Sequence, residues 1–94
     1  MIIDIHTHVD RAEVYGWIDP PEKLLPLLDD AGIEKAAIMT YLDHPVLGAD
    51  PIAIIADAVR RYPDRLIGFV RLNPNFQAAA REALDRCVEE LGFR

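Results

Sequence analysis

Apolar residues along the chain follow two patterns, short runs of strand length and longer stretches with helical spacing. The short runs are rich in Ile, Val, Ala and aromatic residues, and they predict strands at about residues 2–8, 36–41 and 66–72. The longer stretches repeat apolar residues every three or four positions and predict helices at about residues 20–31, 51–61 and 76–91. The predicted order is therefore βαβαβα. The near-continuous apolar character of the second and third strands favours a parallel sheet covered on both faces.

Residues that start and stop helices flank the helical stretches. Asp19 and Asp50 each precede a proline at the start of a helix, and Gly32 and Gly92 follow the ends of the first and third helices. Pro26 lies inside the first helix, where a proline removes one backbone hydrogen bond and clashes with the preceding turn. We therefore expect the first helix to be kinked or to start late.

The spacing of the predicted strands points to a larger repeating architecture. One strand and one helix recur about every 30 residues, which is the length of a βα unit, and a fourth strand is due just after Gly92. Eight such units make about 250 residues, the usual length of a (β/α)8 barrel. We expect residues 1–94 to form an α/β fold that holds the first three βα units of a TIM-like barrel, which is incomplete. The alternative is a complete three-stranded domain, whose sheet edges would be exposed.

Composition narrows the partners and the chemistry. The 94 residues are 51% hydrophobic and carry a net charge of −6, which is the wrong sign for binding phosphates or anionic lipid. We therefore expect neither nucleic acid nor a membrane as a partner. The chain has no serine, its five glycines are too scattered for a phosphate-binding loop, and its single cysteine forms no internal disulfide. The lack of a targeting signal predicts a cytoplasmic protein.

The segment from Asp4 to His8 carries the strongest chemical signal. Side chains alternate along a strand, so Asp4, His6 and His8 are expected to share one face, with Ile3 and Ile5 on the other. In a barrel the helices pack outside, which would direct the isoleucines toward the helices and the polar residues toward the barrel interior. The histidines would then lie at the C-terminal end of the strand, where barrel active sites are found.

Two imidazoles at this spacing can converge on one zinc, iron or manganese ion. The alternative is that they are ordinary polar residues, hydrogen-bonded to backbone or water. Burying three polar groups on an otherwise apolar strand is costly without a partner, and this favours metal binding by His6 and His8. Asp4 lies deeper in the strand, and we expect it to support the site rather than to bind the metal.

Three segments resemble one known group of enzymes. The opening MIIDIHTHVD is similar to the first strand of the metal-dependent amidohydrolase superfamily, with its HxH motif. The stretches YPDRLIGFVRLNP and VEELGFR resemble the amidohydrolase-related branch that includes aminocarboxymuconate semialdehyde decarboxylase. The resemblance implies a TIM-like barrel and a divalent metal, usually zinc, bound first by His6 and His8. In that family the remaining ligands and the proton carrier follow later strands, so no catalytic residue is assigned within this span.

The resemblance also implies the type of reaction. Metal-activated water would hydrolyse a C–N or ester/lactone bond, or the same centre would decarboxylate an unsaturated carboxylic acid, with a small-molecule substrate in the complete protein. These 94 residues alone are expected to be inactive and to self-associate through open sheet edges. One alternative is a metal-dependent phosphoesterase or TatD-type nuclease, which the acidic charge disfavours. The other is a non-catalytic, truncated α/β module.

Four further residues are weaker candidates. His44 lies in the loop after the second strand, where it either reaches a substrate or is a solvated turn residue. Asn73 precedes a proline after the third strand, which is typical of a turn. Tyr15 and Trp17 either cover a ligand or pack over the rim of the barrel.

Overall fold

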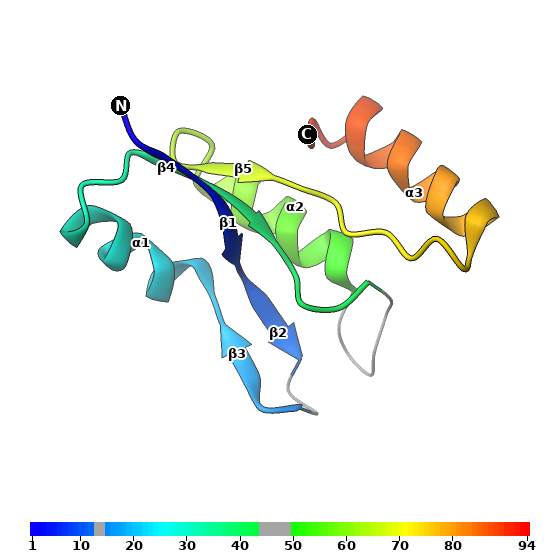
Figure 1. Ribbon diagram of the computed structural model, residues 1–94, viewed down its shortest axis with the longest axis horizontal. Helices are drawn as coiled ribbons and strands as arrows, with labels where there is room; N and C mark the ends of the chain where they lie inside the picture. The colour runs from blue at the N-terminus through cyan, green and yellow to red at the C-terminus, as the bar shows by residue number, and fades with distance from the viewer. Residues whose placement is uncertain (13–14, 44–49) are drawn as a thin grey trace.

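The computed structural model describes residues 1–12, 15–43 and 50–94. Helices and strands alternate along most of the chain (Figure 1). In chain order they are β1 (Ile3–His8), β2 (Asp10–Ala12), β3 (Trp17–Asp19), α1 (Pro21–Asp30), β4 (Lys35–Met39), α2 (Pro51–Arg61), β5 (Leu66–Gly68) and α3 (Gln77–Glu89).

A three-stranded parallel sheet organises the fold, with β4 between β1 and β5. These are the three strands and the parallel direction that the sequence predicts. The third strand is shorter than expected, because regular pairing ends at Gly68 and not at residue 72. Its partner β4 ends at Met39. Just beyond Gly68, the N–H of Phe69 donates a hydrogen bond to the carbonyl oxygen of Ile38 at 2.9 Å.

A short antiparallel hairpin, β2–β3, extends from the C-terminal end of β1 (Figure 1). Asp10 pairs with Asp19, and Ala12 pairs with Trp17. Gly16 has a φ of 70° beside the start of β3, a conformation that glycine adopts without strain. The sequence did not predict this hairpin, because its strands are only three residues long and show no clear alternation of apolar and polar positions.

The helices begin and end close to the predicted residues. The Asp50 side chain accepts hydrogen bonds from the N–H groups of Ile52 (3.0 Å) and Ala53 (3.5 Å), as expected for a residue that caps α2. Pro26 lies within the continuous helix α1, which starts at Pro21, one residue later than predicted. The helix α3 ends at Glu89 and not at residue 91.

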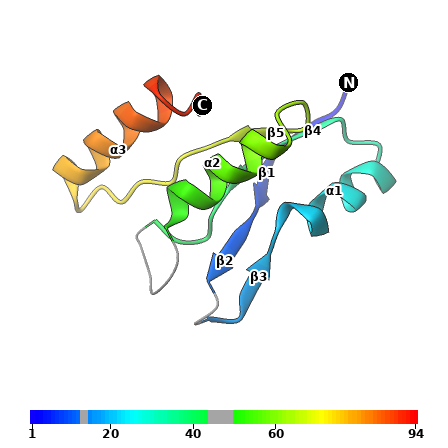
Figure 2. The same cartoon turned by 180° about the vertical axis from the view of Figure 1, so that it is seen from behind.

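The core lies between one face of the sheet and the helices. Helix α2 lies behind the sheet in Figure 1 and in front of it in Figure 2. Ala36 and Ile38 of β4 pack there with Ile55 of α2, and each is at most 2% exposed. The other core residues are Val9, Leu28, Ala58, Leu66, Cys87 and Phe93. Burial raises the pKa of the Cys87 thiol, whose residue is completely inaccessible.

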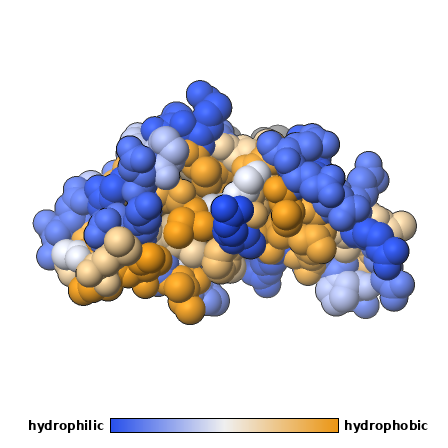
Figure 3. All heavy atoms as spheres, turned by 90° about the horizontal axis from the view of Figure 1, so that it is seen from above, coloured by the Kyte–Doolittle hydropathy of each residue, from blue (hydrophilic) through white to orange (hydrophobic). Residues whose placement is uncertain are grey.

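The opposite face of the sheet carries exposed apolar side chains. Ile3 is 42% exposed and Ile5 is 71% exposed. Seen from above, hydrophobic side chains gather in the middle of the molecule around one strongly hydrophilic group, with hydrophilic side chains at both ends (Figure 3). The described helices therefore cover one face, whereas the sequence predicts cover on both. Helix α3 is also less buried than its apolar face predicts, since Leu84 and Val88 remain 41% and 47% exposed.

The last described residues return to the free edge of β5. The N–H of Arg94 donates to the carbonyl oxygen of Gly68 at 2.8 Å, on the side away from β4. The ring of Phe93 is only 1% exposed and fills the space above Gly68, where an added Cβ would lie 2.9 Å from the phenylalanine Cδ1. This is the position at which the sequence predicts the start of a fourth strand.

No helix in the described ranges is both long enough and apolar enough to cross a membrane.

Candidate metal centre

A β-bulge in β1 determines which of its side chains lie on each face of the sheet. Asp4 pairs with Ala36, whereas Thr7 pairs with Ile38, so β1 uses one residue more than β4 over this interval. Paired residues of neighbouring strands point to the same side of the sheet. Asp4 and Thr7 therefore share the helix-covered face of Ala36 and Ile38, and His8 lies on the opposite face.

The prediction that Asp4, His6 and His8 share one face is therefore wrong for Asp4. The prediction that Ile3 and Ile5 pack toward the helices is also wrong, because both are exposed and neither belongs to the core. The physical reason is the extra residue, which resets the alternation of side chains that an unbroken strand would keep.

The Asp4 carboxylate has a local structural contact. Its Oδ1 accepts a hydrogen bond from the backbone N–H of His6 at 3.0 Å. This bond satisfies a donor within the bulge, where the ladder to β4 is interrupted. Asp4 thus supports the backbone that carries His6, in agreement with the supporting position expected for it.

The two histidine rings lie together. Their centroids are 5.2 Å apart, and the rings meet edge to face at 73°. His6 is exposed and His8 is half-buried. The Nδ1 atom of His8 is buried and has no hydrogen-bond partner among the described residues. A buried ring nitrogen without a partner is costly, and a divalent cation is a partner that suits it.

These two imidazoles make an incomplete set of ligands. Within residues 1–12, 15–43 and 50–94, no group of three or more His, Cys, Asp or Glu side chains is arranged to hold a metal ion. A tetrahedral or octahedral ion needs further ligands. The described residues therefore fit a metal as two neighbouring donors and not as a closed site.

Tyr41, which was not predicted as a site residue, lies against the two histidines. Its ring stacks on the His8 imidazole with centroids 4.0 Å apart and an interplanar angle of 16°. It lies two residues beyond the end of β4, at the same end of the sheet as His8. The available signal was an aromatic residue at the C-terminal end of a predicted parallel strand, but its contact with His8 depends on the register between two strands.

The backbone of Tyr41 is held on both sides. Its N–H donates to Oδ2 of Asp10 at 2.7 Å, and its carbonyl oxygen accepts from Nη1 of Arg71 at 2.5 Å. Asp10 is only 2% exposed, and its Oδ1 also accepts the N–H of Arg11 at 2.9 Å.

The hairpin extends the row of aromatic rings on the side of the sheet that carries His8. Trp17 lies 5.4 Å from Tyr41, and Tyr15 lies 5.2 Å from Trp17, measured between ring centroids. Trp17 and Tyr15 are 40% and 53% exposed, so the structure brings both residues to the side of His8 and leaves much of their surface open.

The two remaining weaker candidates are Asn73 and His44. Oδ1 of Asn73 accepts the N–H of Asn75 at 3.0 Å, which confirms its place in a turn. His44 lies outside the described residues.

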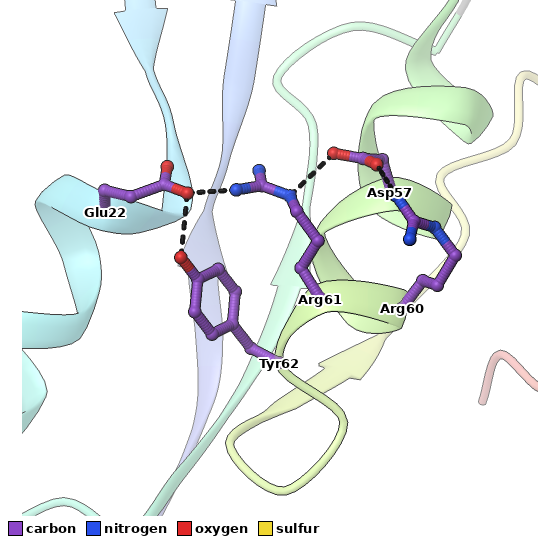
Figure 4. A network of polar contacts seen from close by, with 5 residues as sticks. All are labelled: Glu22, Asp57, Arg60, Arg61 and Tyr62. Atoms are coloured by element: carbon purple, nitrogen blue, oxygen red, sulfur yellow. Dashed lines mark hydrogen bonds and ion pairs between the residues drawn. The ribbon is translucent and has the colours of Figure 1, made fainter.

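A separate ion-pair network joins α1 to α2 (Figure 4). Arg61 contacts both Glu22 and Asp57, Arg60 donates to Asp57, and the Tyr62 hydroxyl donates to Glu22 at 2.8 Å. A hydrogen bond from its own backbone and the Tyr62 hydroxyl hold the pKa of Glu22 below its usual value. Hydrogen bonds from Arg60 and Arg61 lower the pKa of Asp57. This network braces the helix layer and contains neither histidine of the candidate centre.

Solved structures similar to this chain are enzymes of one structural type. The chain aligns with a 2,6-dihydroxybenzoate decarboxylase in complex with 2,6-dihydroxybenzoate, at a TM-score of 0.75 and 24% identity, over 98% of this chain and 37% of that one. It aligns with a dihydroxybenzoic acid decarboxylase from Polaromonas sp. JS666, with bound manganese and the inhibitor 2-nitroresorcinol, at 0.73 and 22%, over 98% and 36%. An amidohydrolase II matches at 0.72 and 20%, over 99% and 38%.

Neither a protein-family model nor a curated protein sequence matches the chain. The likeness therefore concerns the fold, and the chain spans little more than a third of each solved structure, between 36% and 38%. The parallel sheet with its outer helices matches a part of those proteins. The chain thus has the fold of a partial TIM-like α/β barrel, as the sequence predicted.

Proposed function

We propose that this chain is the N-terminal, metal-binding part of a metal-dependent enzyme of the amidohydrolase superfamily. The observation that carries the proposal is the pair His6 and His8, which lie side by side at the C-terminal end of β1, with Nδ1 of His8 buried and without a partner in the described part of the chain. The similar structures support this reading through their fold and through the manganese bound in one of them.

His6 and His8 would provide two of the metal's ligands. Their rings are already adjacent. The hydrogen bond to Asp4 holds the backbone of His6, and the pairing with Met39 holds the backbone of His8. Zinc is the proposed ion, since neutral imidazole nitrogens suit it, and manganese is the alternative. When bound, such an ion activates water and polarises a substrate carbonyl.

The proposed reaction class has two members. One is hydrolysis of a C–N or ester/lactone bond, and the other is decarboxylation of an unsaturated carboxylic acid. The second draws support from the decarboxylases among the similar structures, and the first from the amidohydrolase. The substrate in either case is a small molecule.

These 94 residues alone are proposed to be inactive, because the described residues supply two ligands and no proton carrier is assigned among them. The exposed apolar face of the sheet, opposite the helices, and the outer edges of β1 and β5 favour self-association of the isolated chain. Sedimentation of the chain at several concentrations tests this part of the proposal, and a monomer at all of them would contradict it.

Metal binding is tested by titrating the chain with Zn²⁺ against a chromophoric chelator. His6→Ala and His8→Ala should each weaken binding by tenfold or more, while His44→Ala, which removes the third histidine, should not. Equal affinity in all three variants would contradict the assignment of His6 and His8 as ligands.

A further inference from the structure

Asp10 is a buried carboxylate that joins two segments beyond the end of the regular sheet. The last backbone bond between them runs from Val9 N–H to Met39 O at 3.1 Å. One residue further along, Oδ2 of Asp10 accepts the N–H of Tyr41 at 2.7 Å, so a side chain continues the connection where the backbone ladder stops. With the Arg11 N–H on Oδ1, both carboxylate oxygens have a backbone donor.

This arrangement needs an explanation, because burying a carboxylate is expensive. Asp10 is 2% exposed, and its carboxylate accepts hydrogen bonds from the backbone N–H groups of Arg11 and Tyr41. Desolvation of the charged form is compensated only if each hydrogen bond is well placed. A residue of this kind fixes the geometry of its partners, since any displacement of Tyr41 would leave a buried oxygen without its donor.

The consequence reaches His8 through the ring of Tyr41. Asp10 holds the N–H of Tyr41 and Arg71 holds its carbonyl oxygen, so the backbone that carries the phenol is fixed from both sides. The phenol lies nearly parallel to the His8 imidazole at a centroid distance of 4.0 Å. Rotation about χ2 of a histidine is otherwise a soft motion with broad minima.

We propose that Asp10 is a positioning residue, which fixes Tyr41 so that the Tyr41 ring sets the plane of the His8 imidazole. A ligand ring that is already oriented loses less conformational entropy when it binds a metal. The expected effect on metal affinity rests on the proposed function, whereas the orientation of the ring can be measured without any metal.

The test is NMR of the His8 ring protons in the metal-free chain, assigned by comparison with His8→Ala. A stacked phenol shifts these protons upfield. Tyr41→Phe keeps the ring and the backbone contact and should keep the shift, while Tyr41→Leu should abolish it. Asp10→Ala should reduce the shift and lower Zn²⁺ affinity roughly tenfold. Asp19→Asn is the matched control, since Asp19 pairs with Asp10 across the hairpin and should change neither reading.

The outcomes separate the two proposals. If Asp10→Ala keeps the circular dichroism spectrum of the parent and leaves the His8 shift unchanged, Asp10 does not position the ring. If Asp10→Ala does not fold, Tyr41→Leu decides, because unchanged His8 resonances and Zn²⁺ affinity in that variant also overturn the proposal. An upfield shift that depends on Asp10 in a chain without Zn²⁺ affinity would support the positioning role and contradict the proposed function.

Discussion

The phenol of Tyr41 covers one face of the His8 imidazole, with ring centroids 4.0 Å apart. His8 ends β1 and Tyr41 lies two residues beyond the end of β4, and the pairing of these two strands, in which His8 lies opposite Met39, brings them together. The side of the sheet that carries the histidines is therefore lined by aromatic side chains, and Trp17 of the hairpin extends the row.

Truncation of two isoleucines, one buried and one exposed, should have very different effects on the free energy of unfolding. Ile38→Ala should lower the free energy of unfolding by about 2–5 kcal/mol, because Ile38 is completely buried in the core. Ile5→Ala should change it by less than about 0.5 kcal/mol, because Ile5 is 71% exposed. Urea unfolding followed by circular dichroism measures both. A cost for Ile5→Ala as large as that for Ile38→Ala would mean that Ile5 packs against the helices after all.

Gly68 is expected to tolerate no larger residue. An added Cβ would lie 2.9 Å from Cδ1 of Phe93, so Gly68→Ala should destabilise the fold by about 1–3 kcal/mol. Combining it with Phe93→Leu should cost less than the sum of the two single changes, since the smaller side chain leaves room for the methyl group. Strict additivity in this double-mutant cycle would contradict the contact.

Cys87 should be unreactive in the native chain. It is inaccessible to solvent, and burial raises the pKa of its thiol above the ordinary 9.0, so little of the nucleophilic thiolate is present at neutral pH. Iodoacetamide should modify it slowly in buffer and rapidly in urea, as followed by mass spectrometry. Equal rates in the two conditions would mean that the side of α3 that carries Cys87 does not stay packed against the core.

The network between α1 and α2 predicts a pH dependence. The pKa of Glu22 is lower in the folded chain than its ordinary 4.5, so its stabilising contribution is complete above that value and is lost as the pH falls through the lowered pKa. Glu22→Gln should therefore lower the melting temperature at pH 7 and have a smaller effect at pH 3. The effect is expected to be small, because the network lies at the surface. A deficit of the same size at both pH values would contradict it.

The sequence predicted the regular part of the fold because apolar periodicity reports directly on burial. The burial of the middle residues of β4 and the cap at Asp50 follow from local patterns, and both appear in the structure. The bulge between Asp4 and Thr7 does not follow from such a pattern, since nothing in the alternating residues of this segment marks the extra position. The side chains of Asp4 and Ile5 were misplaced for that reason.

The sequence likewise predicted only part of the candidate site. The spacing of His6 and His8 placed both imidazoles at the end of one strand, and their rings do lie together. Tyr41 and Asp10 were missed, because their contribution arises from the register of two strands separated by a helix and from a side chain that bonds to a distant backbone N–H. Such contacts are tertiary and have no periodic signature.

His6 and His8 are proposed to bind the same metal ion. The most direct measurement is a crystal structure of the chain grown with Zn²⁺, with anomalous diffraction recorded on both sides of the zinc absorption edge. One anomalous peak is expected about 2.0–2.1 Å from a ring nitrogen of each histidine. Crystals that show zinc at other residues, with both imidazoles free of it, would mean that the two histidines do not form a metal site.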